Sequence, residues 1–471
     1  MDNLEICCMS ATELRRAIGA KRLSPVEIMD AALERIDKIN PRVNAYCTVV
    51  AESARKEAKK AEQKVMNKEP LGKLHGLPVS IKDLIFTKGI RTTGGSKMYE
   101  NFVPEQDAIV VERLKNAGAI VIGKTNTPES GWVATTNNPL FGPTRNPWNT
   151  DKTPGGSSGG AASAVAACLG PIAIGSDGGG SIRIPSSFCG VFGLKPSFGR
   201  VPQWPGFSGL WEGLSVTGPI TRTVHDAALV LDVITGYDAR DMYSVPQAAA
   251  QYLTDLHGEL KGMKLAWSSN LGYAVVDKEV LKLTESAAKA FTEFGCEVDE
   301  VSPDVDSPEE AFSTQIAAAV CASLYDKLET WGKDFDPRLA HYVESSIGIP
   351  AIDYVNARMK HIEYYQKMRT FFEKYDLLLT PTLAVPAFNI PYYGPKEING
   401  QKVAPLAWLP FTYPFNITGQ PAASVPCGFT SGGLPVGLQI VGRKFDEVSV
   451  LKAAAAFEKA RPWANKYPPL E

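Results

Sequence analysis

The sequence predicts an α/β fold in which one large mixed β-sheet is flanked by helices on both faces. Short apolar runs typical of buried strands alternate with amphipathic helical patterns along the chain. No Pro/Ser-rich linker, low-complexity block or internal repeat divides the 471 residues. We therefore expect a single domain over residues 1–471, although a length of about 150 residues per domain would suggest three.

The first 68 residues predict a helical segment on the surface. Ser10 and Ser24 are N-cap candidates, and Pro25 stands at the first helical position after Ser24. The stretch AESARKEAKKAEQKVM at residues 51–66 is strongly charged, which is typical of a solvated helix. Nothing in this segment indicates catalysis.

Residues 74–235 carry the clearest strand and helix alternation. A β-rich run from Pro78 to Ile81 ends at Lys82 and Asp83. The stretch DAIVVERLKNAGAIVIGKTN then predicts an amphipathic helix followed by a buried strand, and HDAALVLDVITG predicts another helix.

Residues 236–471 predict a second α/β part that packs on the same sheet. A strand–helix–strand unit comes first, followed by helical segments at residues 309–331, 337–346 and 352–375. DLLLTPT is then a buried strand, two strands are joined by the turn SGG, and a helix over residues 448–461 ends the pattern.

The composition excludes several classes of function. The formal net charge of −2, with both signs mixed throughout, gives no nucleic-acid surface. No apolar run of about 18 residues predicts a membrane span, and the N-terminal residues lack a signal-peptide pattern. The eight cysteines form no CxxC pair and the five histidines have no metal spacing. We therefore expect a cytoplasmic protein without a metal site.

The stretch TPGGSSGGAASAVAACLGPIAIGSDGGGSIR at residues 153–183 contains two Gly/Ser turns separated by small and apolar residues. It lacks the Lys–Ser/Thr pair of a Walker A loop, and no GxGxxG follows a strand. GSSGG matches GxSxG in form, but no histidine has a recognisable partner motif. These exclusions favour a serine nucleophile that works without histidine.

Ser181 is the candidate nucleophile. Gly178, Gly179 and Gly180 precede it, and their N–H groups can turn inward to bind an oxyanion. Its hydroxyl needs a base, for which Lys82 and the serines of the other turn are candidates. Apolar residues flank Lys82, and burial would lower its pKa so that the neutral amine can accept a proton.

The segments GGSSGG, GSDGGGSIRIPSSFCGVFGLKPSFGRVP and LPVSIKDL closely resemble the amidase signature enzymes. This resemblance extends over nearly the whole chain and places the amidase signature core at residues 74–235. It implies a Ser–cis-Ser–Lys triad of Ser181 as nucleophile, Ser157 as bridging serine and Lys82 as base. It also implies an oxyanion hole at Gly178, Gly179, Gly180 and Ser181, with Asp177 and Arg183 as supports of the loop and no cofactor.

The implied activity is hydrolysis of small to medium uncharged carboxamides through an acyl-enzyme, with aryl amides, esters and carbamates as related substrates. Aromatic residues on loops are the candidates for the substrate pocket: Trp132, Phe207, Trp211, Trp408 and Phe411. The first alternative is the A-type chain of a glutamyl/aspartyl-tRNA amidotransferase, from which Trp211 and Glu212 depart. A non-catalytic amidase-like binding module is a minor alternative, and a homodimer is left open.

Overall fold

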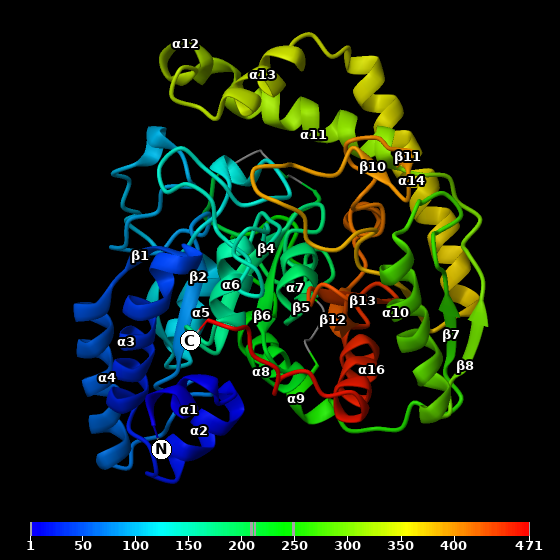
Figure 1. Ribbon diagram of the computed structural model, residues 1–471. Helices are drawn as coiled ribbons and strands as arrows, with labels where there is room; N and C mark the ends of the chain where they lie inside the picture. Colours follow the sequence, from blue (N-terminus) through cyan, green and yellow to red (C-terminus); the bar gives the residue numbers. More distant parts are fainter. Residues whose placement is uncertain (1, 208–210, 212, 247–249, 471) are drawn as a thin grey trace.

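The computed structural model describes residues 2–207, 211, 213–246 and 250–470, and its central feature is an eleven-stranded sheet (Figure 1). In spatial order the strands are β1 (Tyr46–Val49), β3 (Ile120–Thr125), β2 (Pro78–Lys82), β4 (Ile172–Asp177), β6 (Val216–Thr221), β5 (Phe192–Lys195), β12 (Ala422–Phe429), β13 (Pro435–Gly442), β9 (Leu377–Pro381), β7 (Lys264–Trp267) and β8 (Glu297–Glu300).

The sheet is mixed. Strand β2 pairs in parallel with both β3 and β4, and β7 pairs in parallel with β8 and β9. The strands between these two groups pair antiparallel, from β4 through β6, β5, β12 and β13 to β9. Strands from both halves of the chain therefore share one sheet, which confirms the predicted fold class, whereas the internal boundaries at residues 68, 74 and 235 stay a prediction.

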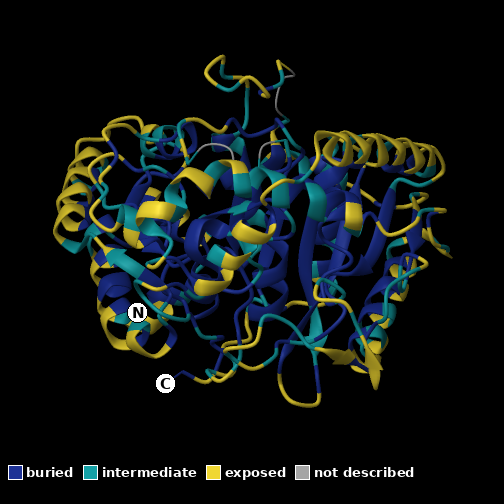
Figure 2. Ribbon diagram, turned by 90° about the horizontal axis from the view of Figure 1, so that it is seen from above, coloured by how far each residue is buried: buried dark blue, intermediate teal, exposed yellow. Residues whose placement is uncertain are grey.

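Helices cover both faces of this sheet. α6 (Gly159–Ala166) and α7 (Arg183–Cys189) pack on one face, and α8 (Val224–Ile234) and α16 (Glu447–Ala460) pack on the other. Alternate residues of β4 follow this division, because Ile172 and Ile174 join the core cluster of α8 and α16 while Ala173 joins that of α6. Figure 2 shows the buried strands at the centre and the exposed outer faces of the helices around them.

The N-terminal segment is helical except for one strand. It contains α1 (Asn3–Cys8), α2 (Ala11–Gly19), α3 (Pro25–Val43) and α4 (Ala51–Met66). Ser10 and Ser24 cap α2 and α3 through capping boxes, as predicted. The expectation of a purely helical segment is wrong at Tyr46–Val49, which forms β1 because the main chain there pairs with the edge of β3.

The remaining elements lie mostly in the second half of the chain. Helices α11 to α14 form an arm beside the sheet (Figure 1), and α14 keeps much of its outer surface exposed. The elements are η1 (Lys97–Tyr99), α5 (Ile109–Asn116), η2 (Glu129–Gly131), α9 (Tyr252–Asp255), α10 (Lys278–Lys289), η3 (Ala290–Phe294), α11 (Glu309–Leu324), η4 (Tyr325–Lys327), α12 (Leu328–Trp331), α13 (Pro337–Ser345), α14 (Ala351–Lys374), β10 (Glu397–Ile398), β11 (Gln401–Lys402) and α15 (Pro414–Ile417). Among the described residues, no helix has both the length and the apolar character needed to span a bilayer.

Candidate active site

Lys82 is the last residue of β2, and the sheet holds it at the centre of the molecule. Its side chain is fully buried, and its Nζ lies 2.6 Å from Ser157 Oγ and 3.0 Å from Ser176 Oγ. Strand β2 pairs with β4, at whose end Ser176 stands, so the backbone pairing fixes the distance between these two side chains. The amine therefore contacts two hydroxyl groups in a site that is nearly closed to water.

The first Gly/Ser turn presents Ser157 to this lysine. The peptide bond between Gly156 and Ser157 is cis, which the resemblance to amidase signature enzymes had implied. The backbone of Thr135 approaches Gly156 so closely that a Cβ there would lie 2.6 Å from the Thr135 carbonyl carbon. Only glycine fits this position, so the sequence GGSS places the hydroxyl of Ser157 toward Lys82.

The second Gly/Ser turn lies directly against the first. The Ser158 N–H donates to the Ser181 carbonyl oxygen at 3.2 Å, which ties the two loops together at their serines. Ser181 is partly exposed, whereas Ser157 is only 3% exposed. Among the described residues, the Ser181 hydroxyl has no hydrogen-bond partner, so it is accessible to a substrate.

A buried ion pair shapes the loop that leads to Ser181. Arg183 donates from Nε and Nη2 to the two carboxylate oxygens of Asp177 at 3.0 and 2.9 Å, and both side chains are fully buried. Asn416 donates to Asp177, and Gln439 accepts from Arg183. Burial alone would raise the pKa of Asp177, but the Arg183 guanidinium holds it well below its usual range. These contacts fit the expected supporting role of Asp177 and Arg183.

The N–H groups of this loop point in two directions. The Gly180 N–H donates to Asp177 Oδ1 at 2.7 Å, and Gly180 has a φ of +129°, a conformation that favours glycine. In the described part of the chain the N–H groups of Gly178, Gly179 and Ser181 donate to no protein acceptor. The expected oxyanion hole therefore reduces to these three groups, because the Gly180 N–H is already used by a buried carboxylate.

A lowered lysine pKa does not by itself identify the base. Burial lowers the pKa of Lys82 to about 7, that of Lys124 to about 8 and that of Lys195 to about 7. Lys124 binds the hydroxyls of Thr87 and Thr92, and Lys195 binds the carbonyl of Pro196. Of these three lysines, only Lys82 contacts a serine of the Gly/Ser turns.

The structure places Trp132, Phe207 and Trp211 close to the two loops. Trp211 covers Gly178, since a Cβ on that glycine would lie 2.6 Å from the indole ring. Trp132 stacks loosely between Tyr342 and Tyr393, and its buried Nε1 has no acceptor among the described residues. These positions fit walls of a substrate site, whereas Glu212, the neighbour of Trp211 in the departing segment, lies outside the described residues.

Trp408 and Phe411 lie elsewhere, in the hydrophobic core. Trp408 is 1% exposed and stacks against Phe188 at 5.9 Å between ring centroids, with Phe388 edge-on at 5.1 Å. Phe411 is fully buried. Their burial gives no support to the expected contact with a substrate, because an aromatic residue in a loop can also fill the core beneath that loop.

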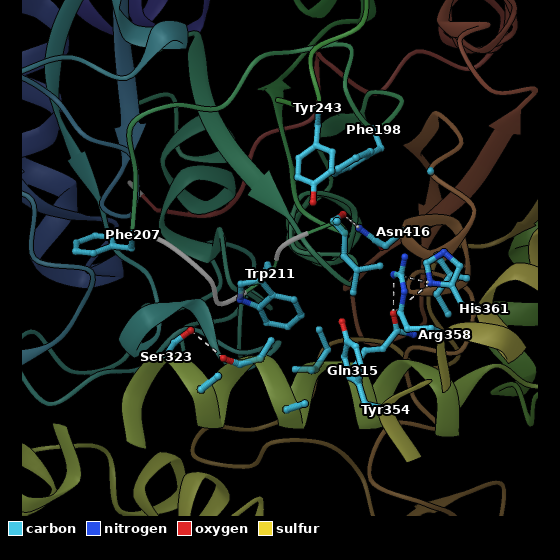
Figure 3. Close-up of a pocket in the computed structure, with 18 of the residues that line it drawn as sticks. Phe198, Phe207, Trp211, Tyr243, Gln315, Ser323, Tyr354, Arg358, His361 and Asn416 are labelled. Carbon is cyan, nitrogen blue, oxygen red and sulfur yellow. Dashed lines mark hydrogen bonds between the residues drawn. The ribbon is translucent and has the colours of Figure 1, made fainter. Parts of the chain in front are cut away.

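Two cavities lie beside the catalytic loops. The larger one has a volume of about 1200 Å³ and extends from Phe207 and Trp211 to Arg358 and His361 (Figure 3). The smaller one, of about 500 Å³, reaches Ser176, the hydroxyl partner of Lys82. Both are lined by Ser130, Phe198, Phe207, Trp211, Gly213 and Tyr243. The shared lining makes them one continuous space next to the buried amine.

Sequence reasoning misses several residues of the site. The sequence pattern gives Ser176 only a place in an apolar strand, and it gives Gln315 only a place in a helix. A signal for Ser176 exists, because a serine in the residue before Asp177 ends the strand that runs beside Lys82. The described residues contain no group of three or more His, Cys, Asp or Glu side chains that could hold a metal ion.

A family model described as "Amidase" matches residues 27–451. The chain is 42% identical to an acylamidase of Rhodococcus erythropolis over 98% of this chain and 97% of the relative. It is 39% identical to the A-type chain of the glutamyl-tRNA(Gln) amidotransferase of Carboxydothermus hydrogenoformans, over 98% and 100% respectively.

Solved structures give the same relationship. A bacterial aryl acylamidase of the amidase signature family superposes with a TM-score of 0.90 at 34% identity, covering 97% of each chain. A 6-aminohexanoate cyclic dimer hydrolase complexed with substrate also reaches a TM-score of 0.90, at 30% identity over 98% of this chain and 99% of the other. The chain therefore belongs to the amidase signature family of amide-hydrolysing enzymes.

Proposed function

We propose that this enzyme hydrolyses carboxamides by acyl transfer to Ser181, with Lys82 as the base and Ser157 as the proton relay. One observation carries this proposal: the fully buried Lys82 amine lies 2.6 Å from Ser157 Oγ, on a turn joined directly to the Ser181 loop. A neutral amine at this position can accept the proton of Ser157 while Ser157 takes the proton of Ser181.

The reaction then follows in two steps. Ser181 Oγ attacks the substrate carbonyl, and the N–H groups of Gly178, Gly179 and Ser181 stabilise the negative charge on the carbonyl oxygen. The C–N bond breaks as the amine leaves with a proton returned through Ser157. Water then attacks the acyl-enzyme, gives its proton to the same relay and releases the carboxylic acid.

The aromatic surroundings favour an apolar acyl or aryl group next to the scissile carbonyl. Trp211 covers Gly178, and Phe312 lies against Gly179, since a Cβ there would lie 2.7 Å from its ring. Such walls suit small to medium carboxamides that are uncharged around the carbonyl, as in the acylamidase and aryl acylamidase to which this chain is similar. Esters and carbamates pass through the same tetrahedral geometry and are expected as further substrates.

The A-type chain of a tRNA-dependent amidotransferase is the second candidate, because relatives with that name align along nearly the whole chain. Such a protein would use glutamine as its amide. We favour the free-standing hydrolase because Trp211 stands in a segment that departs from the usual sequence of those amidotransferase chains. Hydrolysis of glutamine in preference to aryl and alkyl amides would reverse this choice.

A fluorophosphonate probe tests the nucleophile directly, because Oγ attack on phosphorus expels fluoride and leaves a covalent adduct. We expect labelling of wild type, none of Ser181→Ala, and slower labelling of Lys82→Ala. Ser158→Ala is the matched control, since this neighbouring hydroxyl donates to the Ser176 carbonyl and contacts neither Lys82 nor Ser181 Oγ. Undiminished labelling of Ser181→Ala contradicts the assignment, and no labelling of wild type favours a non-catalytic binding module.

We further propose a cytoplasmic enzyme that acts on a small molecule without a nucleic-acid or membrane partner. The balanced net charge of −2 supports this view. Whether the enzyme is a homodimer is decided by its mass in solution, measured by light scattering.

A further inference from the structure

Three cationic or ionisable side chains gather at the end of the large cavity that is farther from Phe207. Arg358 and His361 project from α14, and Lys444 comes from the loop before α16 (Figure 3 labels the first two). We call these three residues, together with Gln315 of α11, the anion corner. No part of the proposed triad or oxyanion hole belongs to it.

Arg358 is held in place by neutral groups. Its Nη1 lies 3.0 Å from Gln315 Oε1 and 3.5 Å from His361 Nδ1. Burial and the neighbouring Arg358 charge lower the pKa of His361 to about 4, so this imidazole is neutral at pH 7. The contacts fix the guanidinium but leave its positive charge without compensation.

Most of the donors of Arg358 remain available. A guanidinium carries five N–H donors, and in the described part of the chain only those on Nη1 have partners. No described carboxylate forms an ion pair with Arg358 or Lys444, in contrast to Arg369 on the same helix, which pairs with Glu373. The one acidic side chain among the described lining residues, Asp326, pairs with the adjacent Lys327 at 2.7 Å.

The anion corner lies within reach of the catalytic loops. Gln315 follows Phe312 by three positions on α11, so the two side chains share a helix face. The Phe312 ring lies against Gly179 of the proposed oxyanion hole. Asn416, which also lines the cavity, donates to the Asp177 carbonyl oxygen at 2.9 Å. A substrate bound at Gly179 can therefore extend along α11 into the corner.

We propose that the anion corner binds a carboxylate of the substrate, so that the preferred amides carry an anionic group remote from the scissile carbonyl. A planar guanidinium with a free edge binds a carboxylate through two parallel hydrogen bonds, and Lys444 adds a second positive charge. The inference rests on the proposed amide hydrolysis. It revises the uncharged substrate expected from the sequence, which then describes only the groups around the carbonyl.

The test compares matched substrates that differ by one carboxylate. For the acyl side the pair is adipoyl mono-para-nitroanilide and heptanoyl para-nitroanilide. For the amine side it is N-hexanoyl-para-aminobenzoate and N-hexanoyl-para-toluidide. We expect the carboxylate to raise kcat/KM about tenfold or more in one of the two pairs, as a charge-assisted contact does, and the pair that responds shows on which side of the amide the group lies.

Variants then assign the effect to the corner. Arg358→Gln should bring the ratio of kcat/KM within the responding pair close to one. Gln315→Glu should do the same by a different route, because the new carboxylate occupies the guanidinium, and it serves if Arg358→Gln does not fold. Lys367→Gln removes one positive charge from an exposed position of α14 and should leave the ratio unchanged.

Each alternative result overturns the inference in a recognisable way. Equal kcat/KM within both pairs, with Ser181 still labelled by fluorophosphonate, refutes the anion corner and leaves the proposed hydrolase intact. A ratio that persists in Arg358→Gln or falls in Lys367→Gln assigns the preference to other charges. Loss of all hydrolysis and labelling in wild type refutes the proposed function and this inference with it.

Discussion

Replacing Ser176 by aspartate should move the pH dependence of this enzyme to higher pH. Ser176 Oγ lies 3.0 Å from Lys82 Nζ, so a carboxylate there would face the amine directly. In wild type, burial lowers the pKa of Lys82 to about 7. A base must be neutral to accept a proton, so kcat/KM should fall tenfold per pH unit below about 7 and level off above it.

The size of the shift follows from the new charge. An opposite charge at this distance raises a lysine pKa by roughly 1 to 3 units, which places the midpoint of Ser176→Asp between about pH 8 and 10. Because Ser176 is partly exposed, solvent screening favours the lower end. At pH 7 the neutral fraction of Lys82 then falls from about one half to about a tenth or less.

The assay is kcat/KM for a neutral para-nitroanilide, measured from pH 5 to pH 10 in buffers of constant ionic strength. Ser176→Ala is the matched control, and its midpoint should stay at or below that of wild type because a hydroxyl acceptor is lost and no charge is added. A wild-type profile that is flat down to pH 5 would refute Lys82 as the base. An active Ser176→Asp variant with an unshifted midpoint would refute the contact between these two groups as the origin of the pH dependence.

Three further outcomes follow from the structure. Gly179→Ala should lower kcat about 100-fold or more, because its Cβ would lie 2.7 Å from the Phe312 ring and displace an oxyanion donor; Phe312→Ala in the same chain should restore part of the rate, and no rescue would mean that the clash is not the cause. Asp177→Asn should destabilise the fold by about 3 to 5 kcal/mol in chemical denaturation, since it leaves Arg183 charged and buried. In wild type the depressed pKa of Asp177 contributes stability above the ordinary carboxyl pKa of 3.8, and this contribution should be lost as the pH falls further below it. Ser24→Ala should reduce stability by about 1 kcal/mol through loss of the α3 cap, without a change in kcat; a loss of activity at full stability would contradict a purely structural role.

Local sequence patterns are sufficient where neighbouring residues decide the structure. The caps at Ser10 and Ser24 and the strand ending at Lys82 follow from side chains within a few positions, and the structure has all three. Strand β1 escapes such patterns because Tyr46–Val49 becomes a strand only through its pairing with β3, more than seventy residues later. The same limit applies to Trp408, whose aromatic loop context gives no sign that it stacks on Phe188 in the core.

The sequence by itself determined the class of fold and the chemical groups available to the site. Two Gly/Ser turns, an isolated lysine after an apolar strand and a serine behind three glycines are local features, and their resemblance to a known family named their expected roles. Only the tertiary structure decided which groups meet. The pairing of β2 with β4 puts Ser176 beside Lys82, the buried Asp177 takes the Gly180 N–H away from the oxyanion hole, and the packing of α14 against α11 brings Arg358 to Gln315. Each of these contacts joins residues distant in sequence or depends on burial, and neither distance nor burial is encoded in a local pattern.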